Sequence, residues 1–331
     1  MKVTIKDVAK EANVATSTVS RVLSNSSSIS EETKKKVNEA IKKLNYVPNA
    51  MARGLANKKT NILAVIAPPG AENIFDNQFF VQAMKGISMC AEEKNYYIMY
   101  AFEDKKYKEK EWIKRFVDSN LVDGICLLRA KEHDECIKYL NSIDFPFVVI
   151  GKQEKVKDML WVDNDNFKAV YELVDLLLER GKEKIAFIGA EKNLNVSIER
   201  LRGYKEALRK NSIEVDDNLI YEGTEFSIEE GEKGAAAVIN KDVKAIVASD
   251  DLLAFGAQNT IKLLGREDIS IVGFNNVYLS AYREPALASV DINAEKLGYY
   301  AVKLLVDYIR KGSVTKSNYI IDTKLIERES L

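Results

Sequence analysis

The sequence is poor in the residues that build disulfides and metal centres. Its 331 residues include three cysteines, Cys90, Cys126 and Cys136, and one histidine. The cysteines are odd in number and show no CxxC spacing, so we expect no disulfide, metal or cofactor, and a buried thiol at Cys126. No apolar run reaches the roughly 20 residues of a membrane span, and the N-terminus has no apolar signal core. We therefore expect a cytoplasmic protein without membrane contact.

Motifs that mark common enzyme classes are also absent. The sequence contains no GxxxxGK[ST], no GxGxxG after a strand, no GxSxG and no HExxH. The single histidine, His133, lies in the charged run KEHDE, which is typical of a solvated surface. No pair of carboxylates has a spacing that assigns an acid and a base. The chain is therefore predicted to be a binding protein and not an enzyme.

Charge is divided unevenly along the chain. Residues 1–60 contain twelve basic and five acidic side chains, a net charge of +7, so the remainder carries −8 of the total of −1. A basic segment joined to an acidic body is typical of a small module that binds a polyanion. The length of 331 residues allows two to three domains.

Three short amphipathic helices are predicted in the basic segment. Thr4 and Asp7 form a capping-box pattern before the first helix, and a turn at Asn13-Val14 leads to the second, Thr16–Ser24. Ser30 has the position of an N-cap for the third helix. This order is that of a helix-turn-helix, whose second helix enters the DNA major groove. The alternative is a generic three-helix subdomain, and the positive charge favours DNA binding.

The segment Tyr46–Lys59 joins the helices to the rest of the chain and reads YVPNAMARGLANKK. Pro48 marks a break, and the helical run after it is too short to be stable alone in water. Gly54 weakens that run by about 1 kcal/mol relative to alanine. Taken alone, these features are typical of a semi-flexible linker.

After Lys59 the pattern changes to an alternation of apolar strands and amphipathic helices, which implies parallel, doubly wound sheets. The alternation restarts after Trp161, so we expect two lobes with a ligand-binding cleft between them. The predicted strands are 62–66, 97–100, 124–128, 145–150, 185–188, 245–247 and 269–273. The predicted helices are 80–94, 109–120, 167–180, 199–210, 228–239 and 251–264.

The basic segment and its linker resemble, without a gap, the head piece of the lactose/galactose-repressor family. The resemblance is carried by the motifs T-V-S-R-V-L, L-N-Y-x-P-N and A-R-x-L. Ala15 departs from the family, which usually has a capping serine there; the loss costs up to about 1 kcal/mol of helix stability. The body resembles the periplasmic sugar-binding-protein fold that this family carries. The implied fold is a small all-α helix-turn-helix head piece plus an α/β core of two doubly wound parallel-sheet lobes.

The resemblance implies four segments and a homodimer. Residues 1–46 would be the DNA-binding domain and 47–60 the hinge helix and linker. Residues 61–161 plus 292–320 would form an effector-binding N-lobe, and 162–291 plus 321–331 a C-lobe. The end of the chain, IIDTKLIERESL, resembles the family's terminal strand. No heptad repeat follows Glu327, so a dimer is expected in place of a tetramer.

The resemblance also implies residues that bind double-stranded operator DNA. Thr16 and Ser17 would contact bases or phosphates, and Arg21 a base edge or the backbone. Leu55 of each subunit would wedge into the minor groove and kink the duplex. Tyr46–Lys59 would then be a hinge that becomes ordered on DNA. The predicted DNA-binding residues are Thr4, Thr16, Ser17, Thr18, Ser20, Arg21, Asn49, Ala52, Arg53 and Leu55.

Effector-binding residues are expected at strand ends. Phe79 and Phe80 open the first helix of the body. The resemblance implies that they lie at the cleft, where their rings would stack on a sugar, and the alternative is that they pack in the core. Asp163 and Asp165 lie in the run DNDN and would bind sugar hydroxyls or cap the next helix. Asp250 has the same two alternatives.

Other effector residues follow from the resemblance. Arg200, three residues before Gly203, matches the family's effector-binding arginine. Asn275 stands where the family commonly has aspartate, so a charge-assisted contact would be lost. Trp161 has the alternatives of sugar stacking and core packing. The predicted effector-binding residues are Phe79, Phe80, Asp163, Asp165, Arg200, Phe226, Asp250 and Asn275.

The segments NQFF, FPFVVIGK, WVDNDN and SVDIN are similar to the maltose-operon repressors of Gram-positive-type bacteria. The chain is thus predicted to repress a carbohydrate-utilisation operon under the control of a small sugar, maltose or a maltodextrin. Effector binding could either release or promote DNA binding. The alternative is a catabolite-control-type regulator governed by a phosphorylated carrier protein, although the DNDN run favours the sugar. A sugar-binding or enzymatic body without DNA function conflicts with the head piece.

Overall fold

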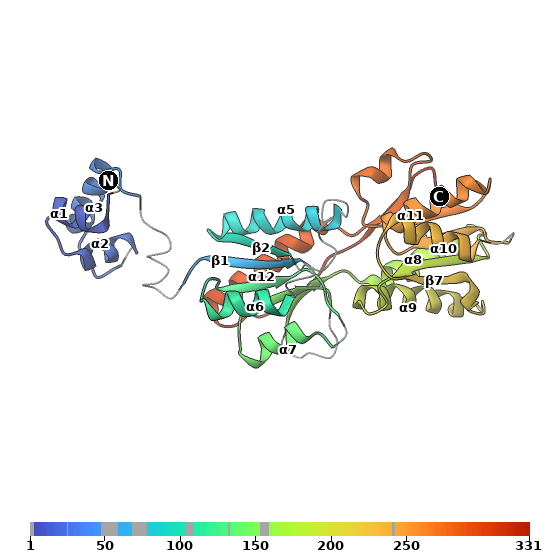
Figure 1. Ribbon diagram of the computed structural model, residues 1–331, viewed down its shortest axis with the longest axis horizontal. Coiled ribbons are helices and arrows are strands. Elements are labelled where there is room, and N and C mark those ends of the chain that lie inside the picture. The colour runs from blue at the N-terminus through green and yellow to red at the C-terminus, as the bar shows by residue number, and fades with distance from the viewer. Residues whose placement is uncertain are drawn as a thin grey trace. The chain divides into compact units, whose positions relative to one another are not determined.

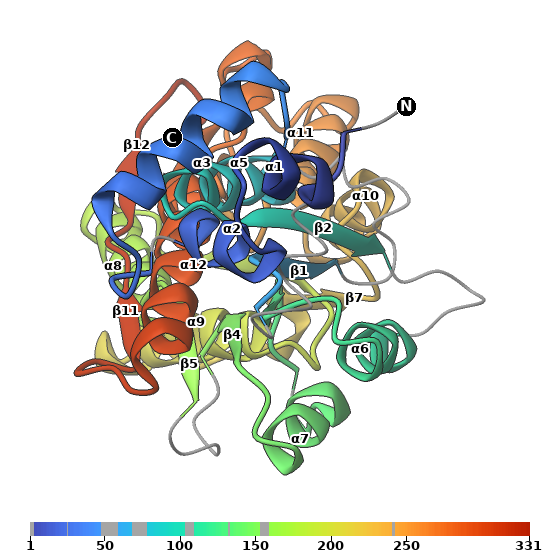
Figure 2. The ribbon, with the colours of Figure 1, turned by 90° about the vertical axis from the view of Figure 1, so that its left-hand side faces the viewer.

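The computed structural model describes residues 3–24, 26–47, 59–67, 78–102, 109–131, 133–152, 159–239 and 242–331. These residues form two compact units, a helical unit built on the chain before Ile62 and a body that makes up most of the rest. Figures 1 and 2 show the elements of both units. No helix in the ranges given above combines the length and the hydropathy that a membrane span requires.

The helical unit consists of α1 (Ile5–Glu11), α2 (Thr16–Leu23) and α3 (Glu31–Lys43). Each helix contributes one fully buried valine to a small core: Val8, Val19 and Val37. The turn before α2 includes Asn13 in a left-handed conformation, with φ of 51°. The predicted helix-turn-helix is confirmed.

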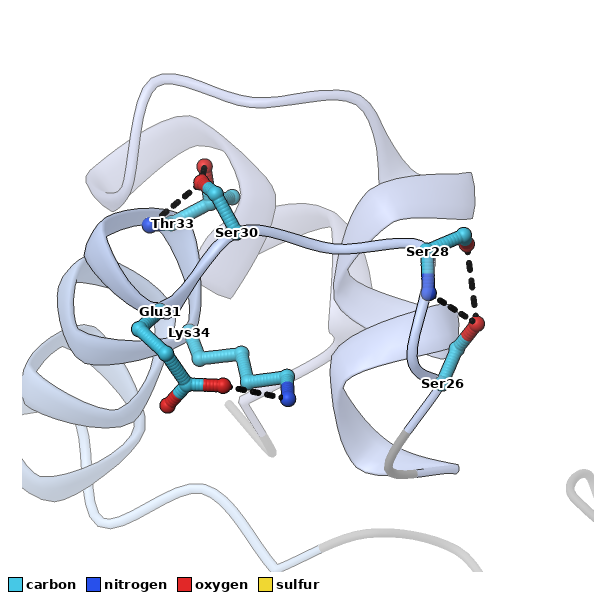
Figure 3. A network of polar contacts seen from close by, with 6 residues as sticks. All are labelled: Ser26, Ser28, Ser30, Glu31, Thr33 and Lys34. Carbon is cyan, nitrogen blue, oxygen red and sulfur yellow. Dashed lines mark hydrogen bonds and ion pairs between the residues drawn. The ribbon is translucent and has the colours of Figure 1, made fainter.

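The helix starts in this unit differ in their capping. The Thr4 backbone N–H donates to Asp7 Oδ2 at 2.8 Å at the start of α1. The Ser30 hydroxyl accepts from the Thr33 N–H at 3.3 Å at the start of α3, as Figure 3 shows. The N-cap of α2 is Ala15, which has no side-chain acceptor to offer. Of the three helices, α2, the second helix of the helix-turn-helix, is therefore the one without a side-chain cap.

Within the described residues, the strands of the body form two six-stranded sheets, with the orders β11-β5-β4-β3-β1-β2 and β12-β10-β9-β8-β6-β7. Neighbouring strands are parallel, except for the antiparallel pair β10–β12. The first sheet contains β1 (Ile62–Ala67), β2 (Tyr97–Phe102), β3 (Gly124–Leu127), β4 (Phe147–Ile150), β5 (Leu160–Asp163) and β11 (Asn318–Ile320). The second contains β6 (Ile185–Ala190), β7 (Ile220–Gly223), β8 (Ala245–Ala248), β9 (Ser270–Phe274), β10 (Ala288–Asp291) and β12 (Lys324–Ile326).

Helices accompany both sheets (Figure 1). The first sheet and α5 (Gln78–Glu93), α6 (Glu109–Asp118), α7 (Glu135–Ser142) and α12 (Ala294–Lys311) form the first lobe. The second sheet forms the second lobe with α8 (Asn166–Glu179), α9 (Asn195–Lys210), α10 (Ile228–Val238), α11 (Asp251–Leu263) and the short helices η2 (Asp217–Leu219) and η3 (Tyr278–Tyr282). The predicted fold of two doubly wound parallel-sheet lobes is confirmed.

Close helix contact in the first lobe depends on glycine. A Cβ at Gly86 of α5 would collide with the Glu295 carbonyl of α12, and one at Gly298 of α12 would collide with the Ala83 carbonyl of α5. The two helices therefore approach nearly backbone to backbone. This packing holds α5, whose first turn carries two predicted site residues, against α12.

Three segments pass between the sheets: β5 to α8, β10 to α12, and β11 to β12. Asn164, on the first of them, is buried and donates from Nδ2 to the carbonyls of Ile292 at 2.9 Å and Ile321 at 2.8 Å. One amide group thus bonds to both of the other crossing segments. The lobes are tied together at this point by a side chain as well as by the backbone.

Several elements differ from the predicted pattern. Helices α7 and α12 and strands β5, β7, β10 and β11 were not among the predicted ones. The terminal segment IIDTKLIERESL contains the last strand, β12, which pairs with β10 in the second sheet. Helix α9 begins at Asn195 in place of Glu199. Helix α7 follows the charged run around His133 and is capped by the Asp134 carboxylate, which accepts from the Cys136 N–H at 2.8 Å.

Candidate DNA-binding and effector sites

Helix α2 separates an apolar face from a polar one. Val19 and Val22 are buried, whereas Thr16, Ser17, Ser20 and Arg21 are exposed, and Thr18 is half-buried. Thr4, at the start of α1, is also exposed, and its hydroxyl donates to Asp7 Oδ2 at 2.7 Å. The structure therefore leaves the predicted base-contacting residues of α2 free of the core.

The remaining predicted DNA-binding residues lie outside the described residues. They are Asn49, Ala52, Arg53 and Leu55, and most of the hinge segment Tyr46–Lys59 lies outside with them. Their roles stay predictions from the sequence.

Four of the predicted effector residues meet where parallel strands of the two sheets end. Asp163 ends β5, Asp250 follows β8 by one residue after Ser249, and Asn275 follows β9 directly. Arg200 reaches this group from α9. Carboxyl ends of parallel strands are the usual place for ligands in doubly wound sheets.

Arg200 is buried at the centre of this cluster, with 5% of its surface exposed. Its Nε donates to Asn166 Oδ1 at 3.0 Å, its Nη1 donates to the Ser249 carbonyl, and its guanidinium lies 4.5 Å from the centre of the Phe274 ring. Burial lowers its pKa to about 10, against the opposing attraction of Asp250, Asp163 and Asp251. The side chain thus remains charged at neutral pH among three carboxylates.

Asp163 and Asp165 have different environments. Asp163 is buried and accepts from the N–H groups of Lys152 and Asn164, both at 2.7 Å, and from Asn166 Nδ2 at 2.9 Å. Burial raises the pKa of the Asp163 carboxyl, and these donors oppose the rise. Asp165 is exposed and caps α8 by accepting from the Lys168 N–H at 3.0 Å. The structure brings Asp163 into the cluster and gives Asp165 the capping role.

Asp250 and Asn275 form a pair. Asp250 Oδ1 accepts from the Leu252 N–H at 2.7 Å and so caps α11, while Oδ2 accepts from Asn275 Nδ2 at 2.7 Å. Asn275 is buried and has a φ of 102°. An aspartate at position 275 would place a second carboxylate here without a proton to donate. The asparagine at position 275 can therefore donate a hydrogen bond to Asp250, which an ionised aspartate could not do.

The predicted aromatic residues lie at the edges of the apolar core. Phe79 and Phe80 are half-buried against the core cluster, with ring centroids 5.1 Å apart in an edge-to-face arrangement. Phe226 is half-buried and packs against a second cluster in the second lobe. Trp161 is also half-buried, on β5 opposite Asn318 of β11. Phe79, Phe80 and Phe226 thus contact the core, and all four residues keep part of their surface exposed.

Three residues of the cluster were not among the predicted ones. Asn166 links Asp163 to Arg200, Ser249 gives its carbonyl to Arg200, and Asp251 lies one residue after Asp250. The DNDN run signalled a polar site, but the partners of Asn164, and the Arg200 donor to Asn166, come from distant segments. Within the ranges that the structure describes, no group of three or more His, Cys, Asp or Glu side chains is placed to hold a metal ion.

Comparison with known proteins matches both units of the chain. Residues 4–49 match the model of bacterial regulatory proteins of the lacI family, and residues 174–331 match a periplasmic binding protein-like domain. The chain is 36% identical to the HTH-type transcriptional regulator MalR of Streptococcus pneumoniae, over 99% of this chain and 100% of that one. It is 33% identical to Catabolite control protein A of Staphylococcus aureus, over 98% of each chain.

A solved structure extends the match to the whole fold. The transcriptional regulator CelR in complex with cellobiose superposes with a TM-score of 0.77 at 28% identity, over 99% of this chain and 100% of that one. The helix-turn-helix, the two-lobed body and the full-length relatives agree. The chain therefore belongs to the lacI family of bacterial regulatory proteins, and it is a transcriptional regulator and not an enzyme.

Proposed function

We propose that the protein is a homodimeric repressor of a carbohydrate-utilisation operon. In this proposal, each subunit binds double-stranded operator DNA through α2, and a small sugar between the two lobes controls DNA affinity. Maltose or a maltodextrin is the proposed effector. The proposed division of the body is 61–161 plus 292–320 for one lobe and 162–291 plus 321–331 for the other.

The exposed face of α2 supports DNA binding. Thr16, Ser17 and Arg21 project from a helix whose opposite face is held by buried valines, so their placement does not depend on DNA. An arginine that contacts guanine contributes about 1–3 kcal/mol of base discrimination. The +7 charge of residues 1–60 would add phosphate attraction that weakens with salt.

The buried polar cluster around Arg200 is the observation that carries the sugar proposal. It places carboxylates, amides and a guanidinium at strand ends, and these groups donate to and accept from hydroxyls. The half-buried rings of Phe79 and Phe226 would supply apolar faces for a sugar ring. A solved relative supports a sugar effector, because the structure of the transcriptional regulator CelR contains cellobiose.

The second candidate is control by a phosphorylated carrier protein. The similarity to Catabolite control protein A, at 33% identity, is what supports it. A phosphoprotein would require a basic surface, whereas the Arg200 cluster is buried and rich in acceptors. The cluster therefore favours the sugar.

DNA binding is tested by selecting sites from random duplex DNA with the full-length protein. We expect a symmetric site, because a two-fold dimer reads two half-sites. Arg21→Ala should weaken binding to that site about 10- to 100-fold. Lys36→Ala on α3 is the matched control, since Lys36 is exposed and paired with Glu32 at 2.8 Å. Recovery of only asymmetric sites would contradict a homodimer.

The hinge requires its own test. Leu55→Ala should weaken binding to the selected site far more than binding to random duplex, because only the specific complex would be kinked by the wedge. Equal losses on both DNAs would exclude the wedge.

The effector is tested by the thermal stability of the full-length protein with maltose, longer maltodextrins, cellobiose, or a phosphorylated carrier protein. Ligand that binds only the folded state raises the melting temperature. We expect the largest rise with maltose or a maltodextrin. A rise with the carrier protein and none with any sugar would establish the second candidate instead.

A further inference from the structure

The lobes also touch away from the crossing segments. Residues after β3, in the first lobe, meet the start of α9, in the second: Lys131 pairs with Leu194 in an isolated antiparallel bridge. The Asn195 N–H donates to the Ala130 carbonyl at 3.2 Å. Asn195 Nδ2 donates to the Lys152 carbonyl, just after β4, at 2.6 Å. Asn195 therefore bonds to two separate segments of the other lobe.

The start of α9 needs these contacts. Leu194 is the N-cap of α9 and has no side chain that accepts a hydrogen bond. The first N–H groups of a helix have no partner within the helix. Here the first of them is satisfied by the Ala130 carbonyl, so the first lobe does what a capping side chain usually does. If the lobes separated, that N–H would turn to water.

Glu191, close to the start of α9, has an unusual backbone conformation and a charged neighbour in the first lobe. Glu191 has a φ of 44°, a left-handed conformation that is uncommon for glutamate. Its carboxylate lies 3.9 Å from Arg129 of the first lobe. Burial raises the pKa of the Glu191 carboxyl and Arg129 and Lys131 oppose the rise. Strained residues persist where surrounding contacts hold them.

The contact leads directly to the polar cluster. The Lys152 carbonyl accepts from Asn195, while its N–H donates to Asp163 Oδ2 at 2.7 Å. Asp163 Oδ1 accepts from Asn166, and Asn166 accepts from Arg200. Asn195 and Arg200 also lie on the same helix. A continuous series of hydrogen bonds thus joins the interlobe contact to Arg200.

We propose that Asn195 is a positioning residue, which latches α9 to the first lobe and so sets the lobe separation at which the Arg200 cluster receives its effector. The latch consists of Asn195 and Leu194 with the Ala130, Lys131 and Lys152 backbone of the first lobe. Only its effect on the effector rests on the proposed sugar function. Its effect on lobe separation does not.

The test measures lobe separation in the full-length protein without ligand. Spin labels on Ser142→Cys in the first lobe and Glu206→Cys in the second give a distance distribution by pulsed electron paramagnetic resonance. Both positions are exposed, whereas the native cysteines are buried. Excess unlabelled chain keeps the two labels of one molecule isolated from those of a dimer partner. Asn195→Ala should shift the distribution to longer, broader distances, and Asn195→Asp should do so more, because its carboxylate would face the Lys152 carbonyl.

Asn211→Ala is the matched control. Asn211 lies at the other end of α9, and its Nδ2 bonds only within the second lobe in the contacts observed, to Asp175 at 2.6 Å and to the Ala207 carbonyl at 2.9 Å. We expect its distance distribution to equal that of the wild type. An unchanged distribution in Asn195→Ala, or equal changes in both variants, would overturn the latch.

Maltose titration of the same variants tests the link to the effector. Asn195→Ala removes one hydrogen bond from the lobe arrangement that receives the effector, so the affinity for maltose should fall about three- to tenfold. The affinity of Asn211→Ala should equal that of the wild type. Equal maltose affinity in Asn195→Ala and the wild type would overturn the link. If the wild type binds no sugar, the proposed sugar function fails, and the ligand-free distances still decide whether the latch exists.

Discussion

At the scale of single residues, Arg200 holds the polar cluster of the body together. It is the buried cation among Asp163, Asp250 and Asp251, and each of these carboxylates favours its charge. Removing one partner of a buried charged group leaves the other uncompensated, which typically costs about 3–5 kcal/mol. The same residue is the one proposed to bind the effector.

Arg200→Met should therefore have two effects. The free energy of unfolding should fall by about 3 kcal/mol or more, measured by urea denaturation, because the carboxylates lose their cation. The maltose-induced thermal shift should disappear, whereas operator binding in the absence of sugar should persist. Arg202→Met is the control: Arg202 is exposed and paired with Glu199 at 2.9 Å, so little change is expected. A comparable loss in both variants would contradict the special role of Arg200.

Asp251 is a carboxylate of the cluster that accepts hydrogen bonds from three neutral, buried groups. Its side chain is fully buried and accepts from the Val277 N–H at 2.8 Å, from Ser280 Oγ at 2.8 Å and from Ser289 Oγ at 2.6 Å. Its pKa is raised to about 7, chiefly by burial and also by the neighbouring Asp250, against the effect of these three donors. A carboxyl group of the fold thus titrates near neutral pH.

The sign of the resulting pH dependence follows from linkage. The pKa of Asp251 is about 7 in the folded protein and 3.8 for an unperturbed aspartate, so the folded state binds more protons between these values. The contribution of this group to the free energy of unfolding therefore falls as pH rises from about 4 to about 7, and is level above that. Asp251→Asn should flatten the decline between pH 5 and pH 8, measured by urea denaturation.

A matched acid gives the control for this titration. Asp268 is exposed, and its hydrogen bond from Arg266 holds its pKa down at about 2, so it stays ionised throughout the measured range. Asp268→Asn should leave the pH dependence parallel to that of the wild type. Parallel curves for Asp251→Asn and the wild type would show that Asp251 does not titrate in this range.

At the scale of elements, α2 would gain stability from one substitution at its N-cap. Its N-cap, Ala15, has φ of −68° and ψ of 150°, the extended conformation that N-cap residues adopt, but no side-chain acceptor. Ala15→Ser should stabilise α2 by about 1 kcal/mol. The measurement is hydrogen exchange of the α2 amides in the full-length protein. Ser30→Ala should speed exchange in α3 by a similar factor, since Ser30 caps that helix; faster exchange in α2 of Ala15→Ser would contradict the prediction.

Capping also explains which helices the sequence predicts well. The predicted ranges of α8 and α11 agree with the structure to within one residue at each end. Both begin with an aspartate cap, Asp165 or Asp250, so the residues next to the helix start are enough to predict it. Helix α9 begins four residues before its predicted start, at Asn195. The first N–H of α9 is satisfied by the Ala130 carbonyl of the other lobe. The residues next to the helix start do not reveal such a contact, so they could not predict where α9 begins.

In the candidate site, too, the sequence predicted which residues take part but not which distant residues they bond to. Asp163, Arg200, Asp250 and Asn275 could be placed in one cluster from strand ends and the family resemblance. Their pairing could not, because Asn275 meets Asp250 across 25 positions of the chain and Arg200 meets Ser249 across 49. The sequence suggested that Asn275 loses a charged contact. The structure shows that its amide donates to a carboxylate.

At the scale of the whole body, the two lobes are coupled through Asn164. Its amide lies where three crossing segments meet, and its two N–H bonds go to the Ile292 and Ile321 carbonyls, 128 and 157 positions away. An effector that changes the lobe arrangement would act on these segments as well as on the contact at Asn195. We therefore expect Asn164 to influence how strongly a conformational change in one lobe alters the conformation of the other.

Asn164→Ala should weaken this coupling. Two buried carbonyls would lose their donor, which costs about 1–3 kcal/mol, and the two lobes should unfold less cooperatively. Calorimetry of the full-length protein should show the transition of the body broaden or divide in Asn164→Ala, and more so in Asn164→Asp, whose carboxylate would face both carbonyls. Asn211→Ala, which removes an amide with bonds inside one lobe, should lower the melting temperature without dividing the transition. A body that still melts in one sharp transition in Asn164→Asp would show that the backbone crossings alone couple the lobes.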